Sequence, residues 1–335
     1  MKAIVLKTHG GVENFELREV PDPEIGKNEV LVQIKACSFN PADYQIRQGG
    51  PETNMVSSMI LGRDLSGIVL KTGKKVNSLK AGDEVMAYSS IMGSNGSNAE
   101  LIALPANILG KKPKNLSWSQ AAAIPVVGLT ALQTIKQTNL KPEQNIFITG
   151  GSGGVGSFFI KLAQHFRINN IITTAGSEKS KEYLIDLGLK AEQIIDYRQE
   201  DLVRKILELN ADKYFDVCID FVGGNISEIA AGVLKIKGTF VDIPFLTTST
   251  ARTILFNKSA TVQNIAIYSN ALTEEAELRN QFSENLNILS QLFEQEVLEP
   301  LPVNEIGDFS VKTVQTGHTL LEQNAMKGKL VMRIN

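Results

Sequence analysis

A glycine-rich loop constrains the fold of this chain more than any other feature. The loop, GGSGGVG at positions 150–156, follows an apolar segment at 145–149 and precedes a helical run at 158–166. Glycines in such a loop permit a tight turn, close approach of the backbone to a pyrophosphate, and close packing of helix on strand. The helix N-terminus adds free N–H groups and a positive dipole. The order strand, glycine loop, helix therefore predicts a dinucleotide site rather than a merely flexible loop. The loop residues expected to contact the cofactor are Ser152, Gly153, Gly154, Val155 and Gly156.

The end of the second strand decides which dinucleotide is bound. An acidic residue there would hydrogen-bond the ribose hydroxyls of NAD, and none is present. Ser177 stands there instead, followed by Lys179 and Lys181, and a hydroxyl with two ammonium groups suits the extra phosphate of NADP. Tyr197, after the next strand, could close over that phosphate. The alternative is that Ser177 only caps the helix and the lysines are solvated, although capping and phosphate binding are compatible. The charge of Glu178 works against a phosphate. We expect NADP(H) as the cofactor.

Residues 119–268 alternate strands and helices, which is typical of a doubly wound parallel sheet. Helical spacing is clearest at 154–165 and 179–187. We therefore predict an α/β chain with an NADP-binding Rossmann domain at 119–268. Six strands are predicted, enough for a complete dinucleotide fold: 145–149, 171–174, 193–195, 217–221, 239–243 and 261–267.

Residues 1–118 read as short strands punctuated by glycine and proline, which predicts a barrel-like β domain. The tail at 269–335 reads as a helix over 274–295, a strand, a last helix and a closing strand over 329–334. We expect this tail to pack back on the first domain. The strands predicted in the first part are 3–6, 15–20, 29–36, 67–71, 84–88 and 99–104.

Composition excludes several classes of protein. A chain of 335 residues favours about two domains, and 43% apolar with 21% charged residues is ordinary for a globular protein. A net charge of -2 without a Lys/Arg block argues against a nucleic-acid partner. The longest apolar stretch, 121–132, is interrupted by Pro125 and Gly128, so no membrane segment is expected. No cleavage signal follows the start, and Cys37 and Cys218 are expected to be reduced and buried, which predicts a cytoplasmic location.

Eight short segments, in order along nearly the whole chain, resemble the medium-chain dehydrogenase/reductase superfamily and specifically its zinc-free quinone oxidoreductase branch. They are ACSFNPADY (36–44), LGRDLSGIV (61–69), AGDEV (81–85), AAAIP (121–125), GLTA (128–131), GGVG (153–156), FDVCID (215–220) and GKLV (328–331). The resemblance implies a chaperonin-like β-barrel catalytic domain built from 1–118 and 269–335, with the Rossmann domain inserted between them. It also implies a homodimer through the edge strand at 261–267, although a buried edge is the alternative.

The zinc-dependent relatives need a cysteine, a histidine and a further cysteine or carboxylate around one open metal position. Where they carry the metal cysteine this chain has Asn40, and where they carry the metal histidine it has Arg63. Residues 89–98, where a structural zinc lobe could lie, contain no cysteine. We therefore expect no metal. The histidines are scattered over a turn and two helices: His9, His165 and His318.

Without a metal Lewis acid, reduction of a quinone or an α,β-unsaturated carbonyl is easier than oxidation of an alcohol. Such an acceptor takes hydride directly if a donor meets the negative charge that develops on its oxygen. By resemblance, Asn40 and Tyr44 face the nicotinamide and could donate such bonds, although a turn at Asn40 and simple packing of Tyr44 are the alternatives. Arg63 and Asp64 are interpreted as an ion pair.

Three further residues are predicted to contact the cofactor. Thr130 resembles the superfamily's residue near the nicotinamide, and Val222 and Ile243 lie just beyond strand ends that should border the cofactor. We expect a zinc-independent, NADPH-dependent quinone or enone oxidoreductase. An enoyl-thioester reductase, and an NADPH-binding structural or sensor protein with little turnover, remain as alternatives. The loops at 49–59 and 244–257 should set the substrate, which the sequence does not identify.

Overall fold

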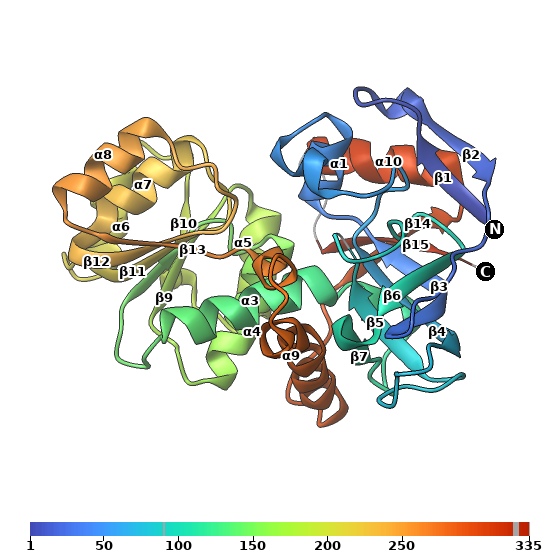
Figure 1. Ribbon diagram of the computed structural model, residues 1–335. Coiled ribbons are helices and arrows are strands. Elements are labelled where there is room, and N and C mark those ends of the chain that lie inside the picture. The colour runs from blue at the N-terminus through green and yellow to red at the C-terminus, as the bar shows by residue number, and fades with distance from the viewer. Residues whose placement is uncertain (90, 324–327, 335) are drawn as a thin grey trace. The chain divides into compact units, whose positions relative to one another are not determined.

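The computed structural model describes residues 1–89, 91–323 and 328–334, and the chain divides into two compact units (Figure 1). The first contains Met1–Leu129 and Tyr268–Asn335, and the second is Thr130–Ile267. The sequence predicts that the Rossmann domain begins at residue 119, earlier than the division between Leu129 and Thr130 in the structure. Helix α2 (Trp118–Ala122) packs on strands of the first unit, and α3 (Pro125–Thr138) carries the chain across the division, so the boundary falls within that helix.

The first unit is built around a seven-stranded sheet with the order β14-β15-β3-β4-β5-β7, in which β6 also pairs with β3. β1 (Lys2–Leu6) and β2 (Phe15–Glu19) form a separate antiparallel pair. β15 runs antiparallel to β3 with Met332 opposite Cys37, so the tail does pack back on the first part of the chain. The strands of the large sheet are β3 (Glu29–Ser38), β4 (Asp64–Thr72), β5 (Glu84–Tyr88), β6 (Leu101–Pro105), β7 (Leu109–Lys111), β14 (Val303–Asp308) and β15 (Lys329–Arg333).

Three more helices belong to this unit: α1 (Pro41–Arg47), α9 (Ala276–Glu294) and α10 (Val311–Glu322). α1 begins where the sequence suggests a turn. Asn40 is its N-cap, a proline stands in the first turn, and the Asp43 carboxylate accepts the Asn40 backbone N–H at 2.8 Å. A proline at the first helical position is favourable, because its missing N–H would have no partner there.

The second unit contains a six-stranded parallel sheet with the order β10-β9-β8-β11-β12-β13. Numbered from β8, this order is the doubly wound dinucleotide arrangement, which confirms the predicted fold class. The edge strand β13 is shorter than the predicted 261–267. The strands are β8 (Ile146–Ile148), β9 (Ile171–Ala175), β10 (Ile194–Asp196), β11 (Phe215–Asp220), β12 (Leu234–Asp242) and β13 (Thr261–Asn264). The helices are α4 (Gly154–His165), α5 (Glu178–Asp186), α6 (Leu202–Leu209), α7 (Asn225–Val233) and α8 (Ser249–Asn257).

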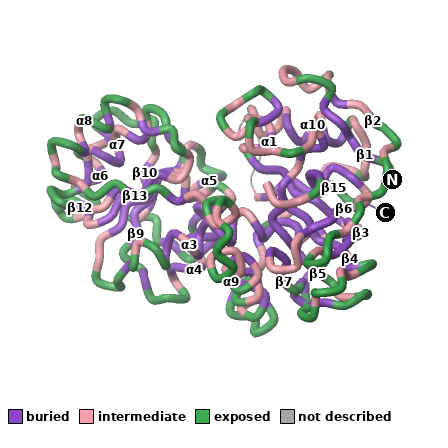
Figure 2. The backbone as a smooth tube through the Cα atoms, in the orientation of Figure 1, coloured by how far each residue is buried: buried purple, intermediate pink, exposed green. Residues whose placement is uncertain are grey.

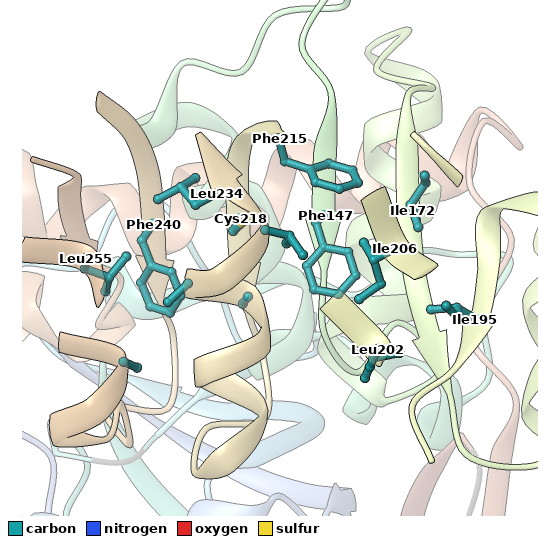
Figure 3. Close-up of a cluster of buried hydrophobic side chains, with 14 residues drawn as sticks. Phe147, Ile172, Ile195, Leu202, Ile206, Phe215, Cys218, Leu234, Phe240 and Leu255 are labelled. Atoms are coloured by element: carbon teal, nitrogen blue, oxygen red, sulfur yellow. The ribbon is translucent and has the colours of Figure 1, made fainter. Parts of the chain in front are cut away.

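Buried apolar side chains of the strands and of α6, α7 and α8 form a core cluster of the second unit. Figure 3 shows Phe147, Phe215, Phe240 and Cys218 among fourteen residues of this cluster. In Figure 2 the interior of this unit is largely purple, which marks buried residues, and green segments lie around it. Both cysteines are free and buried, as expected. Within the described ranges, every helix is too short or too polar to cross a bilayer.

Candidate cofactor and active site

The glycine loop follows β8 and leads into α4. Gly150 has a φ of +66°, in the left-handed region where a side chain is strained, and the N–H of Gly153 donates to the Gly150 carbonyl at 2.9 Å. Gly153 is the N-cap of α4 and makes no side-chain cap bond. Because glycine has no side chain to accept them, N–H groups of the first turn remain available to an anion.

Three glycines of the loop lie against atoms that a side chain would displace. A Cβ at Gly156 would come within 2.3 Å of the Gly150 carbonyl oxygen, and one at Gly151 within 2.4 Å of Thr173 Oγ1. A Cβ at Gly150 would lie 2.7 Å from Val222 Cγ2, so Val222 covers the turn while remaining 46% exposed. The loop therefore has the close backbone packing that a pyrophosphate cradle needs. The remaining predicted loop residues, Ser152, Gly154 and Val155, are partly buried.

The buried carboxylate of Asp220 holds the end of β11, the strand next to β8 in the sheet. Asp220, at the end of β11, accepts the Thr149 hydroxyl at 2.6 Å and the N–H groups of Val222 and Gly223, both at 3.0 Å. Ile243 is partly buried and donates its N–H to the Asp220 carbonyl at 3.2 Å. Hydrogen bonds to Asp220 thus link the end of β11 to the residues that follow β8 and β12. Sequence reasoning missed Asp220, whose signal is an acidic residue at the end of an otherwise apolar strand.

The predicted phosphate side lies at the ends of β9 and β10. Ser177 caps α5 and accepts the Ser180 N–H at 3.2 Å. Lys179 is exposed and Lys181 partly exposed, and neither pairs with an acidic group among the described residues. Tyr197 lies against Gly176, where a Cβ would come within 2.5 Å of the Tyr197 hydroxyl oxygen. Ser177 and Tyr197 are therefore both next to the same turn.

One cation near this turn was missed by sequence reasoning. Arg198, directly after Tyr197, forms an exposed ion pair with Asp196 at 2.6 Å. Hydrogen bonds from Arg198 lower the pKa of the Asp196 carboxyl to about 2. Since this guanidinium already has a carboxylate partner, its positive charge is partly neutralised.

A buried polar cluster occupies the first unit where α1 begins. One carboxylate oxygen of Asp64 accepts the Ser38 hydroxyl at 2.8 Å and the Asn40 amide at 2.9 Å, and the other accepts the Val126 N–H at 2.8 Å. The Lys329 ammonium lies 2.6 Å from Asn40 Oδ1 and 3.4 Å from Asp64 Oδ2. Asp64 is therefore bonded to the end of β3, the start of α1, the start of α3 and β15.

The prediction that Arg63 and Asp64 form an ion pair is wrong, because each side chain has a different partner. The two residues are adjacent where β4 begins, and neighbouring side chains of a strand point to opposite faces. Arg63 instead forms an ion pair with Glu52 and lies 3.9 Å from Asp43. Burial raises the pKa of the Asp43 carboxyl to about 7, and the Arg63 charge opposes that shift.

The comparisons with known proteins agree with this architecture. The family described as "Alcohol dehydrogenase GroES-like domain" matches residues 26–114, and that described as "Zinc-binding dehydrogenase" matches residues 154–291. Quinone oxidoreductase 1 of Escherichia coli is 31% identical over 97% of each chain. This chain belongs to the medium-chain dehydrogenase/reductase superfamily.

Two further similarities are to proteins named as oxidoreductases. The chloroplastic NADPH-dependent alkenal/one oxidoreductase of Arabidopsis thaliana is 36% identical over 72% of this chain, and the match spans 62% of that relative. The crystal structure of Escherichia coli quinone oxidoreductase complexed with NADPH superposes with a TM-score of 0.85, at 27% identity, over 99% of this chain and 100% of that chain.

The residues of this superfamily member do not fit zinc at the position that its metal-dependent relatives use. Zinc needs thiolate, imidazole or carboxylate ligands. By the resemblance, Asn40 stands in place of the metal cysteine, and in the structure its amide oxygen faces the Lys329 ammonium. By the same resemblance, Arg63 stands in place of the metal histidine, and a guanidinium has no lone pair to donate to a metal. In the part of the chain that the structure describes, no group of three or more His, Cys, Asp or Glu could hold a metal ion. Metal independence stays a prediction.

The predicted donors to the substrate differ in their surroundings. Asn40 is 3% exposed, and its amide is bonded within the cluster, so it is not a freely moving donor. Tyr44 lies on α1, partly exposed, and its hydroxyl has no hydrogen-bond partner among the described residues. Thr130 lies on α3 and is 5% exposed. Lys329 belongs to the GKLV segment, and no local sequence pattern predicts its contact with Asn40.

Proposed function

We propose that this protein is an NADPH-dependent oxidoreductase that transfers hydride to quinones or α,β-unsaturated carbonyls without a metal. The observation that carries the proposal is the uncapped glycine turn at the start of α4, followed at the next strand end by a hydroxyl and two ammonium groups in place of an acid. Relatives named as quinone oxidoreductases and as an NADPH-dependent alkenal/one oxidoreductase support it.

In this proposal the loop residues Ser152 to Gly156 would hold the pyrophosphate of the cofactor, and backbone N–H groups and the dipole of α4 would stabilise its charge. Ser177, Lys179 and Lys181 would hold the additional phosphate through charge-assisted hydrogen bonds. Tyr197 would close over that end, and Val222, Ile243 and Thr130 would border the remainder of the cofactor.

Bound NADPH supplies the hydride, and the protein supplies position and electrostatics. Hydride addition places negative charge on the acceptor oxygen, so a donor close to that oxygen lowers the barrier. The Tyr44 hydroxyl is suited to this role, because no described residue uses it. Water supplies the proton that completes the reduction.

We also propose a homodimer and a cytoplasmic location. Among the described residues, β13 is an edge strand that pairs with β12, and Val262 on it is 51% exposed, so this edge could pair with a second copy. The unpaired cysteines suit a reducing compartment.

The experiment is an acceptor screen that follows NADPH absorbance, with quinones, enones, enoyl thioesters and simple alcohols tested side by side. The proposal expects oxidation of NADPH by quinones or enones and a weaker response to NADH. Preference for crotonyl thioesters would favour an enoyl-thioester reductase. NADPH binding without turnover by any acceptor would favour a structural or sensor protein.

A further inference from the structure

We propose that Lys329 and Asp64 are positioning residues that hold the amide of Asn40 as a fixed hydrogen-bond donor to the acceptor oxygen. The inference deepens the proposed reductase function and rests on it. It assigns a task to two buried charges that neither the cofactor site nor Tyr44 requires.

The chemistry of the partners fixes which way the Asn40 amide points. An ammonium group has donors and no acceptor, so the Asn40 atom 2.6 Å from Lys329 Nζ must be the amide oxygen. An ionised carboxylate has acceptors and no donor, so the atom 2.9 Å from Asp64 must be the amide nitrogen. One N–H of this nitrogen remains, and it has no acceptor among the described residues. If the amide were reversed, its NH₂ group would face the Lys329 ammonium and its oxygen would face the Asp64 carboxylate, and neither contact could be a hydrogen bond.

Burial makes this arrangement rigid. The side chains of Lys329 and Asp64 are 5% and 0% exposed. The Lys329 ammonium has three acceptors, since it also lies 3.2 Å from the Phe39 carbonyl. Ser38 and the Val126 N–H hold the Asp64 carboxylate from other directions. A donor held in this way needs no reorganisation when charge develops on the substrate.

The ammonium also makes Asn40 a stronger donor. Hydrogen bonds in a chain polarise one another, and the effect is larger in a low-dielectric interior. Donation from Lys329 to the amide oxygen withdraws electrons from the amide nitrogen, so its remaining N–H becomes more acidic. A buried Lys–Asp pair often adds little to stability relative to apolar residues. Folding stability therefore does not by itself explain why the chain buries the Lys329–Asp64 ion pair.

The first test observes the amide directly and does not depend on turnover. In ¹⁵N-labelled protein, the side-chain NH₂ signals of Asn40 are identified by their loss in Asn40→Ala. We expect Lys329→Met to move both proton signals upfield, while Lys112→Met leaves them in place. Lys112 is a matched control, because it is a buried lysine of the same unit that pairs with Glu84 and lies outside the cluster. Unchanged Asn40 signals in Lys329→Met would overturn the inference.

The second test is a double-mutant cycle on turnover with an active acceptor. Lys329→Met should lower kcat about tenfold or more and change the Kd of NADPH less than about twofold. In an Asn40→Ala background, the same change should lower kcat less than about twofold, because the group through which Lys329 acts is gone. Independent effects of the two substitutions would contradict the positioning role. If Lys329→Met does not fold, Asp64→Asn combined with Lys329→Met removes both charges and is used in both tests. A wild type that oxidises no NADPH overturns the proposed function, and the amide signals still decide the positioning.

Discussion

The buried histidine of α10 gives a sharp prediction about acid stability. His318 is 0% exposed, and neither ring nitrogen has a hydrogen-bond partner among the described residues. Its ring packs edge-on against Phe15 and Phe39, with ring centroids 4.9 Å and 6.0 Å away. Burial, with a smaller contribution from the Arg47 charge, lowers the pKa of His318 from 6.5 to about 3.

The sign of the pH dependence follows from proton linkage. Because the pKa in the folded protein lies below the unfolded value, the unfolded chain binds the proton more tightly. The contribution of His318 to stability is present above pH 6.5 and is lost as the pH falls from 6.5 towards 3. At pH 5 the loss amounts to about 2 kcal/mol relative to pH 8.

The test is urea unfolding of the wild type and His318→Leu at pH 8 and pH 5. Leucine is similar in volume and does not titrate, so the wild type should lose about 2 kcal/mol more unfolding free energy than the variant over this range. His165→Leu is the matched control, since His165 is exposed at the end of α4, and it should keep most of the wild-type pH dependence. Equal pH dependence in the wild type and His318→Leu would refute the reasoning.

Three further predictions concern the cofactor, the metal and the substrate donor. Lys179→Ala and Lys181→Ala together should erase the preference for NADPH over NADH. The change in relative affinity should be about tenfold or more, because a charge-assisted phosphate contact contributes about 1.5 to 3 kcal/mol. Equal Kd values for both cofactors in the wild type would contradict the assignment of the phosphate site. Purified protein should contain no stoichiometric zinc, because by the resemblance Asn40 and Arg63 stand where zinc-dependent relatives carry ligands. One zinc per chain by elemental analysis, with loss of activity to a chelator, would contradict this. Tyr44→Phe and Asn40→Ala should each lower turnover, by about a hundredfold where water cannot replace the donor; unchanged turnover in both would remove their assignment.

Much of the second unit could be predicted because its signals are local. The glycine loop, the apolar strands and the helical spacing between them fix a doubly wound sheet, and the structure has that strand order. α1 was missed because Asn40 followed by proline fits both a turn and a helix start.

The buried polar cluster around Asp64 was harder to predict, because its members are distant in sequence. Lys329 contacts Asn40, which lies 289 residues earlier in the chain, so no sequence spacing indicates the contact. A lysine side chain is also rarely buried, so composition does not indicate the contact either. The adjacent charges Arg63 and Asp64 suggested a pair, yet strand geometry turns them apart and each finds a different partner.

The most direct test of the central claim follows the hydride itself. NADPH deuterated at the transferable position is mixed with the protein and an enone, and the product is analysed for the label. We expect that NADPH is oxidised and that deuterium appears on the β-carbon of the product. NADPH that binds and stays reduced with every quinone and enone offered, while NADP supports the oxidation of simple alcohols, would contradict it.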